Sequence, residues 1–85
     1  MGILLTNHAR FKLWLLEQHG FRFTEDLVKE AIKHPDFAKD ARFNRFSAHK
    51  NLNDLTLRVI YEERDNIITV VTVMVVRRGR YGNKI

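Results

Sequence analysis

The stretch Ile67–Val76, with the sequence IITVVTVMVV, decides the fold of this chain. Thr69 and Thr72 are its only polar residues, and β-branched residues dominate the rest, as is typical of a β-strand. A strand with one face in water alternates apolar and polar residues, whereas this stretch is apolar at both its odd and its even positions, which face opposite sides of the sheet. We therefore expect a central strand, or one that buries its second face against the tail, a loop or a second copy of the chain.

A second predicted strand, Leu55–Arg64, comes immediately before it. Asp65 and Asn66 lie between the two and are suited to a two-residue hairpin turn, because both tolerate positive φ. Every second residue of this strand lies on the same face. We expect one of these faces, with Leu55, Leu57, Val59 and Tyr61, to pack against the helices. The opposite face of the sheet then receives Thr56, Arg58, Ile60, Glu62 and Arg64.

A first helix is expected near the start of the chain. Thr6 and Asn7 are good N-cap residues, so the helix should follow from about His8 to His19. It should end at Gly20, since glycine readily adopts the left-handed conformation after a helix. Its apolar residues form two stripes, and we expect Trp14 to be a core anchor.

A second helix should begin after Thr24, with two acidic residues in its first turn, and stop before Pro35. The short connection between the helices predicts an αα-hairpin. The stretch that follows is basic and weakly patterned, and part of it, from Ala41 to His49, is a candidate first strand. The order predicts one α+β domain over residues 1–85, with the helical pair packed on a twisted antiparallel sheet of three to four strands.

Composition narrows the classes of partner. The 85-residue chain has a formal charge of +5 and a pI near 10.0, which favours a polyanion such as RNA, DNA or an acidic protein. The absence of cysteine excludes disulfides and thiolate chemistry and fits a reducing cytoplasm. There is no convincing targeting signal, and we expect no membrane association.

The chemistry-bearing residues are basic and aromatic. The sequence has no glycine-rich phosphate loop, no nucleophile elbow and no metal-binding spacing, so we expect neither a metal nor another cofactor. Cleavage of RNA without a metal needs a base, an acid and cations that stabilise the phosphorane. Residues of these kinds are His8, Arg10, Lys12, Arg58, Arg77, Arg78, Arg80 and Tyr81, with Glu62 as the one suitably placed carboxylate. The alternatives are that His8 is a capping or surface histidine and that the arginines form a solvated charge run.

Several motifs together resemble a known family. They are Asn7–Leu13, Thr24–Asp36, Leu57–Val76 and the pair Arg80-Tyr81. In this order they resemble a family of small prokaryotic proteins that is grouped with the RelE/ParE-like toxins of toxin–antitoxin systems. The resemblance implies a RelE-like fold, cleavage of RNA that is free or on the ribosome, and an antitoxin that covers the basic face.

Three positions carry over from this resemblance: His8, Arg80 and Tyr81. Lys12 stands where the family has an arginine, and lysine lacks the forked geometry that binds phosphate at two points. The resulting hypothesis is a toxin-like, metal-independent endoribonuclease that cleaves mRNA. Its catalytic residues would be His8, Glu62, Arg80 and Tyr81, and its RNA-binding residues Arg10, Lys12, Arg58, Arg77 and Arg78. The alternatives are a non-catalytic RNA- or protein-binding module of the same fold and a structural homodimer.

Overall fold

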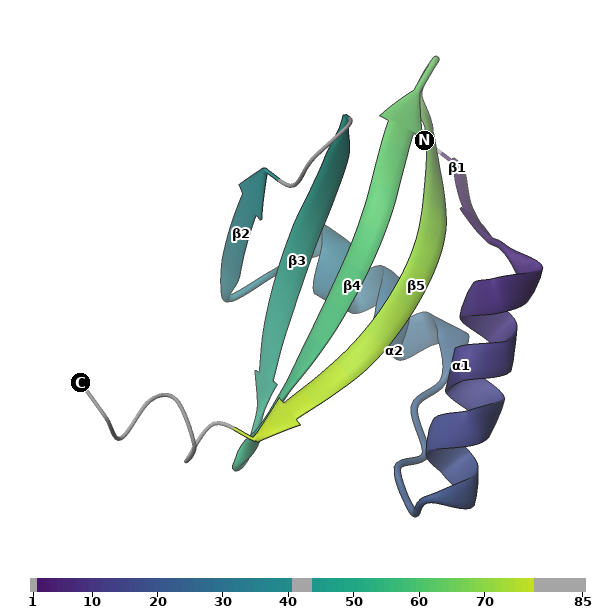
Figure 1. The fold of residues 1–85 in the computed structure, drawn as a ribbon. Helices are drawn as coiled ribbons and strands as arrows, with labels where there is room; N and C mark the ends of the chain where they lie inside the picture. The colour runs from purple at the N-terminus through teal and green to yellow at the C-terminus, as the bar shows by residue number, and fades with distance from the viewer. Residues whose placement is uncertain (1, 41–43, 78–85) are drawn as a thin grey trace.

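A computed structural model of the chain describes residues 2–40 and 44–77. The elements are β1 (Gly2–Leu5), α1 (Asn7–Gln18), α2 (Glu25–Lys33), β2 (Phe37–Asp40), β3 (Arg45–Leu52), β4 (Leu55–Arg64) and β5 (Ile67–Arg77). The five strands form one sheet in the order β1-β5-β4-β3-β2 (Figure 1). The expected α+β class is confirmed.

The sheet differs from the expectation in its strand number and direction. It has five strands instead of three to four, and it is mixed, because β1 pairs with β5 in parallel while the other pairs are antiparallel. The unexpected strands β1 and β2 have four residues each and form the two edges. The expected strand 41–49 is replaced by β3, which begins at Arg45; residues 41–43 lie outside the described part.

The helix ends follow the caps read from the sequence. The hydroxyl of Thr6 accepts a hydrogen bond from the backbone N–H of Ala9 at 3.0 Å, and that of Thr24 accepts one from Leu27 at 3.1 Å. Gly20 has a φ of 93°, a left-handed conformation that glycine adopts without strain. These local interactions confirm both predicted helices to within about two residues at each end, the usual uncertainty of a helix boundary.

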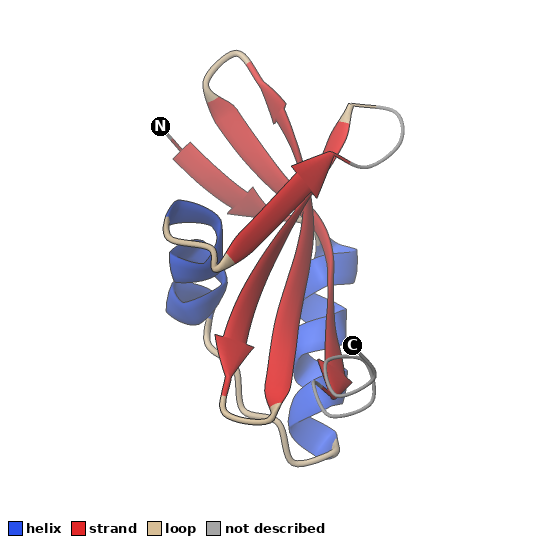
Figure 2. Ribbon diagram, turned by 90° about the vertical axis from the view of Figure 1, so that its left-hand side faces the viewer, coloured by secondary structure: helices blue, strands red, loops and turns tan. Residues whose placement is uncertain are grey.

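Both helices pack on one face of the sheet, α1 against β5 and α2 across β3 and β4 (Figures 1 and 2). The core joins residues of the two helices to residues of β4 and β5, among them Ala9, Leu13, Val28, Ala31, Leu57, Val59, Val70 and Val73. The predicted inward face of β4 is therefore confirmed for Leu57 and Val59, with Tyr61 packed against the same core, whereas Leu55 is not part of it. The prediction for Trp14 was wrong: its side chain is 55% exposed and stacks on Phe11, because only the stripe with Ala9 and Leu13 faces the sheet.

A register shift explains the unusual pattern of Ile67–Val76. Asp65 and Asn66 form the predicted turn, with φ of 53° and 63°, and β5 then pairs with β4. Tyr61 pairs with Val70 and Ile60 with Thr72, so Val71 has no partner in this register. The bulge exchanges inward and outward positions. An even-numbered residue, Val70, faces the core before the bulge, whereas the odd-numbered Val73 and Val75 face it afterwards. This switch partly explains why both the odd and the even positions of the stretch are apolar.

The core predicts a contrast between two identical substitutions. Leu57 is fully buried, whereas Leu4 in the edge strand β1 is 59% exposed. We expect Leu57→Ala to lower the free energy of unfolding by about 2–5 kcal/mol, because it leaves a cavity against the helices. Leu4→Ala should lower it by less than about 1 kcal/mol. Urea denaturation followed by circular dichroism measures both, and equal effects would contradict the packing described.

Candidate nucleic-acid interface

The second face of the sheet is covered by neither helix (Figure 1). Four residues are paired directly across four neighbouring strands on this face: Phe37 in β2, His49 in β3, Arg58 in β4 and Met74 in β5. Directly paired residues in a sheet project to the same side. Because Arg58 alternates with the core residues Leu57 and Val59, this row points away from the helices. We call these four residues the cross-strand row.

Hydrogen bonds hold the middle of the cross-strand row in place. Arg58 Nε donates to Ser47 Oγ at 3.1 Å, and Ser47 Oγ lies 2.7 Å from His49 Nε2. Arg58 Nη1 also approaches Met74 Sδ at 3.9 Å. Ser47 is fully buried, so its hydroxyl forms hydrogen bonds with these neighbours and not with solvent. The guanidinium and the imidazole are therefore oriented before any ligand arrives.

The surroundings of His49 favour the neutral form of its imidazole. Burial lowers the pKa of its imidazole from the ordinary value of 6.5, and the positive charges of Arg58 and Lys39 lower it further. The ring is therefore mostly neutral at pH 7. When Nε2 donates its proton to Ser47 Oγ, the lone pair of Nδ1 is free, and within the described residues Nδ1 makes no hydrogen bond.

Two further cations lie on the same face. Lys39 pairs with Ser47 across β2 and β3, so its side chain projects to the side of the cross-strand row. Arg45 donates from Nε to Glu62 Oε2 at 2.9 Å and shares its charge with that carboxylate. Among the described residues, Arg58 and Lys39 form no ion pair with a carboxylate. Their positive charge is available to a bound anion.

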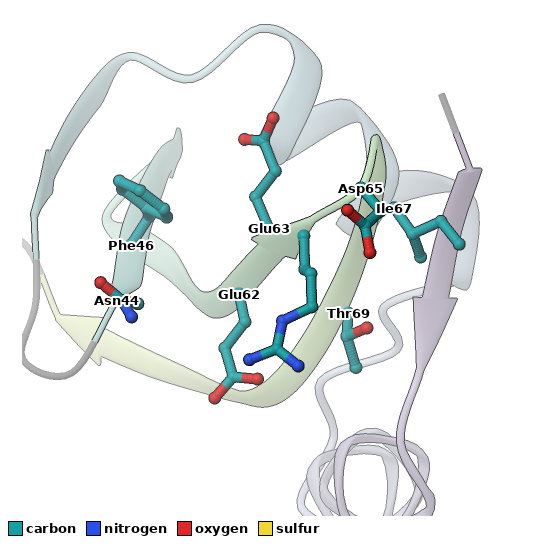
Figure 3. A pocket seen from close by; sticks show the side chains of 8 residues that line it. Asn44, Phe46, Glu62, Glu63, Asp65, Ile67 and Thr69 are labelled. Carbon is teal, nitrogen blue, oxygen red and sulfur yellow. The ribbon is translucent and has the colours of Figure 1, made fainter.

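A cavity of about 520 Å³ lies at the turn end of β4 and β5 (Figure 3). Its lining includes the carboxylates of Glu62, Glu63 and Asp65 and one guanidinium, that of Arg64. Even with Arg45 paired to Glu62, the carboxylates at this cavity outnumber the guanidinium groups, which disfavours a phosphate. The cross-strand row, and not this cavity, is consequently the candidate site for a nucleic acid.

The predicted site residues fall into separate groups. His8, Arg10 and Lys12 lie on α1, which packs on the opposite face of the sheet from Arg58 and Glu62. Arg10 forms an ion pair with Glu25. The structure thus does not bring the helix residues together with the two predicted residues of β4.

The remaining predicted residues lie at and beyond the end of β5. Arg77 ends this strand and is 3.7 Å from a carboxylate oxygen of Asp54. Arg78, Arg80 and Tyr81 lie outside the described residues. Their predicted roles stay predictions.

Sequence reasoning missed Phe37, Ser47 and His49 as site residues. A partial signal for two of them is present in β3, where Arg45, Ser47, His49 and Asn51 alternate with Phe46, Ala48, Lys50 and Leu52, and only Lys50 interrupts the apolar set. This period of two indicates a strand with one solvent-facing side. Phe37 had no such signal, because a four-residue strand is too short to establish a period.

Comparisons with known proteins add no relative. No protein-family model, no curated protein and no solved structure matches the chain.

Within residues 2–40 and 44–77, no group of three or more histidine, cysteine or acidic residues is arranged to hold a metal ion. None of the described helices is long and apolar enough to cross a membrane.

The environment of His49 gives a prediction for its titration. We expect the imidazole of His49 to titrate below 6.5, and Arg58→Gln to raise its pKa toward that value. The variant removes one positive charge that disfavours the imidazolium, while the burial that contributes most remains. NMR titration of the imidazole resonances measures this change. Arg22→Gln, which alters an exposed arginine between the helices, is the matched control and should leave the pKa of His49 unchanged.

Proposed function

We propose that this protein is a metal-independent endoribonuclease that binds RNA across the sheet face that carries the cross-strand row, as expected for the toxin of a toxin–antitoxin pair. The observation that carries the proposal is the cross-strand row, where the buried hydroxyl of Ser47 holds the imidazole of His49 and the guanidinium of Arg58, which has no carboxylate partner among the described residues. Arginine suits phosphate because its fork can donate two parallel hydrogen bonds. The sequence motifs that resemble the RelE/ParE-like family support the same function independently.

The proposed reaction uses His49 as the base. Its imidazole takes the proton from a ribose 2′-hydroxyl, and the 2′-oxygen attacks the adjacent phosphorus. Arg58 stabilises the negative charge of the phosphorane. The bond to the 5′-oxygen breaks, that oxygen takes a proton from solvent, and the products are a 2′,3′-cyclic phosphate and a 5′-hydroxyl. Arg80 and Tyr81 are proposed to add charge stabilisation and base stacking.

A second candidate is a non-catalytic RNA-binding module that uses the same face. The separation of His8 from Arg58 and Glu62 favours it, because the residues expected to form one catalytic centre lie on two sides of the sheet. The ion pair of Glu62 with Arg45 also reduces the availability of that carboxylate as a base. The two candidates share the binding surface and differ in whether a product forms.

The proposal predicts which histidine supports cleavage. In buffer with EDTA, purified protein should cut RNA with and without ribosomes, and His49→Ala should reduce the cleavage rate by about 100-fold or more, as loss of a general base does. His19→Ala, an exposed change at the end of α1, is the matched control and should retain the rate. Loss of cleavage in His8→Ala but not in His49→Ala would move the centre to α1 and contradict the assignment.

Binding without cleavage would instead support the second candidate. Its affinity for single-stranded RNA should fall steeply with salt, because bound cations release counterions from the phosphates. Arg58→Gln should flatten the log–log salt slope by about 0.7 for each phosphate contact it removes. A purified protein that neither binds nor cuts RNA would overturn both candidates.

A further inference from the structure

Phe37 is an exposed aromatic residue at the end of the cross-strand row. Its side chain is 56% exposed although it belongs to a strand of the sheet. Such exposure of a large apolar ring has a cost in water, which a ligand that covers the ring would remove. We infer that Phe37 is the stacking surface for an unpaired base, and that the site takes single-stranded RNA. This inference rests on the proposed function and names its substrate class.

The surroundings of Phe37 are those of a base-binding position. Its ring meets the ring of His49 at 5.2 Å between centroids and an angle of 71°, an edge-to-face contact. An edge-to-face contact covers at most one face of the phenyl ring, and the exposure shows that the ring retains free surface. Stacking on this surface would place a base directly beside the proposed catalytic imidazole.

The distance from Phe37 to Arg58 fits one nucleotide. The two residues are separated by the single strand β3, so they lie two strand spacings apart, or roughly 10 Å. A base on Phe37 would leave its ribose over His49 and the adjoining phosphate near Arg58. The order aromatic ring, imidazole, guanidinium thus follows the order base, ribose, phosphate.

Charge favours an anionic ligand at this position. Lys39 follows Phe37 at the next outward position of β2, and neither Lys39 nor Arg58 has an ion-pair partner among the described residues. The exposed pair Phe11 and Trp14 on α1 provides the contrast. It lies on the helical side of the molecule, away from the cross-strand row, and the adjacent Arg10 is paired with Glu25.

Single strands are selected because stacking needs a free base face. In a duplex each base is covered above and below by its neighbours, and a ring fixed on a sheet cannot enter the stack. In a single strand the bases can be splayed onto an aromatic ring, whatever their identity. The inferred preference is therefore for strandedness and not for a particular sequence.

The test uses an RNA that cannot be cut. A short fluorescent single strand with 2′-O-methyl riboses lacks the attacking hydroxyl, so its anisotropy reports binding alone. Phe37→Ala should weaken its affinity by about 5- to 100-fold, and Phe37→Trp should retain it. Phe11→Ala, the same change at a ring that is 53% exposed on α1, is the matched control and should change affinity by less than about twofold. The same sequence as a duplex should bind more weakly to wild type, by a margin that Phe37→Ala removes.

A spectroscopic measurement keeps the inference testable if Phe37→Ala is poorly folded. Trp14 is the chain's one tryptophan, so the double variant Trp14→Phe, Phe37→Trp carries its only indole at the site. Quenching of that fluorescence by the single strand and not by the duplex is expected. If Phe37→Ala binds like wild type, or the indole is not quenched, while Arg58→Gln weakens binding, the stacking inference is overturned and the proposed RNA face stands. If wild type binds no RNA, the proposed function itself fails.

Discussion

The hydrogen-bonded register between β4 and β5 is the constraint on which the rest of the structure depends. It pairs Val59 with Val73 in the core and, one residue earlier on β4, Arg58 with Met74 on the face that neither helix covers. A slip by one residue would exchange every inward side chain for an outward one. Stability and the candidate site are thus fixed by the same set of backbone bonds, because burying Val59 requires Arg58 to point outward.

The elements with both a periodic pattern and a specific end signal could be predicted from the sequence. The β4–β5 hairpin combines two long apolar strands with an Asp-Asn turn, and each helix begins at a threonine cap. The edge strands β1 and β2 could not be predicted, because four residues give no period and their pairing depends on partners elsewhere in the chain. Trp14 was misplaced for a related reason: two apolar stripes were visible, and only the assembled sheet selects one of them.

The candidate site was predictable only in part. Alternation within β4 placed Arg58 and Glu62 on the outward face, since the facing of a strand follows from its own residues. The side of the sheet on which α1 packs is a property of the whole fold, so the sequence did not reveal that His8 is remote from Arg58. Ser47 and His49 acquire their importance from the pairing of β3 with β4, which sets their side chains beside the guanidinium.

Because of the bulge at Val71, the number of residues in β5 determines which side chains face the core, and not only their identity. The residues before it and after it are out of phase, so the strand behaves as two half-strands joined at a fixed offset. Removing a single residue there would leave the amino-acid content almost unchanged. It would nevertheless reverse which side chains face the core in one half of the strand relative to the other, so a one-residue deletion would expose apolar side chains that are now buried.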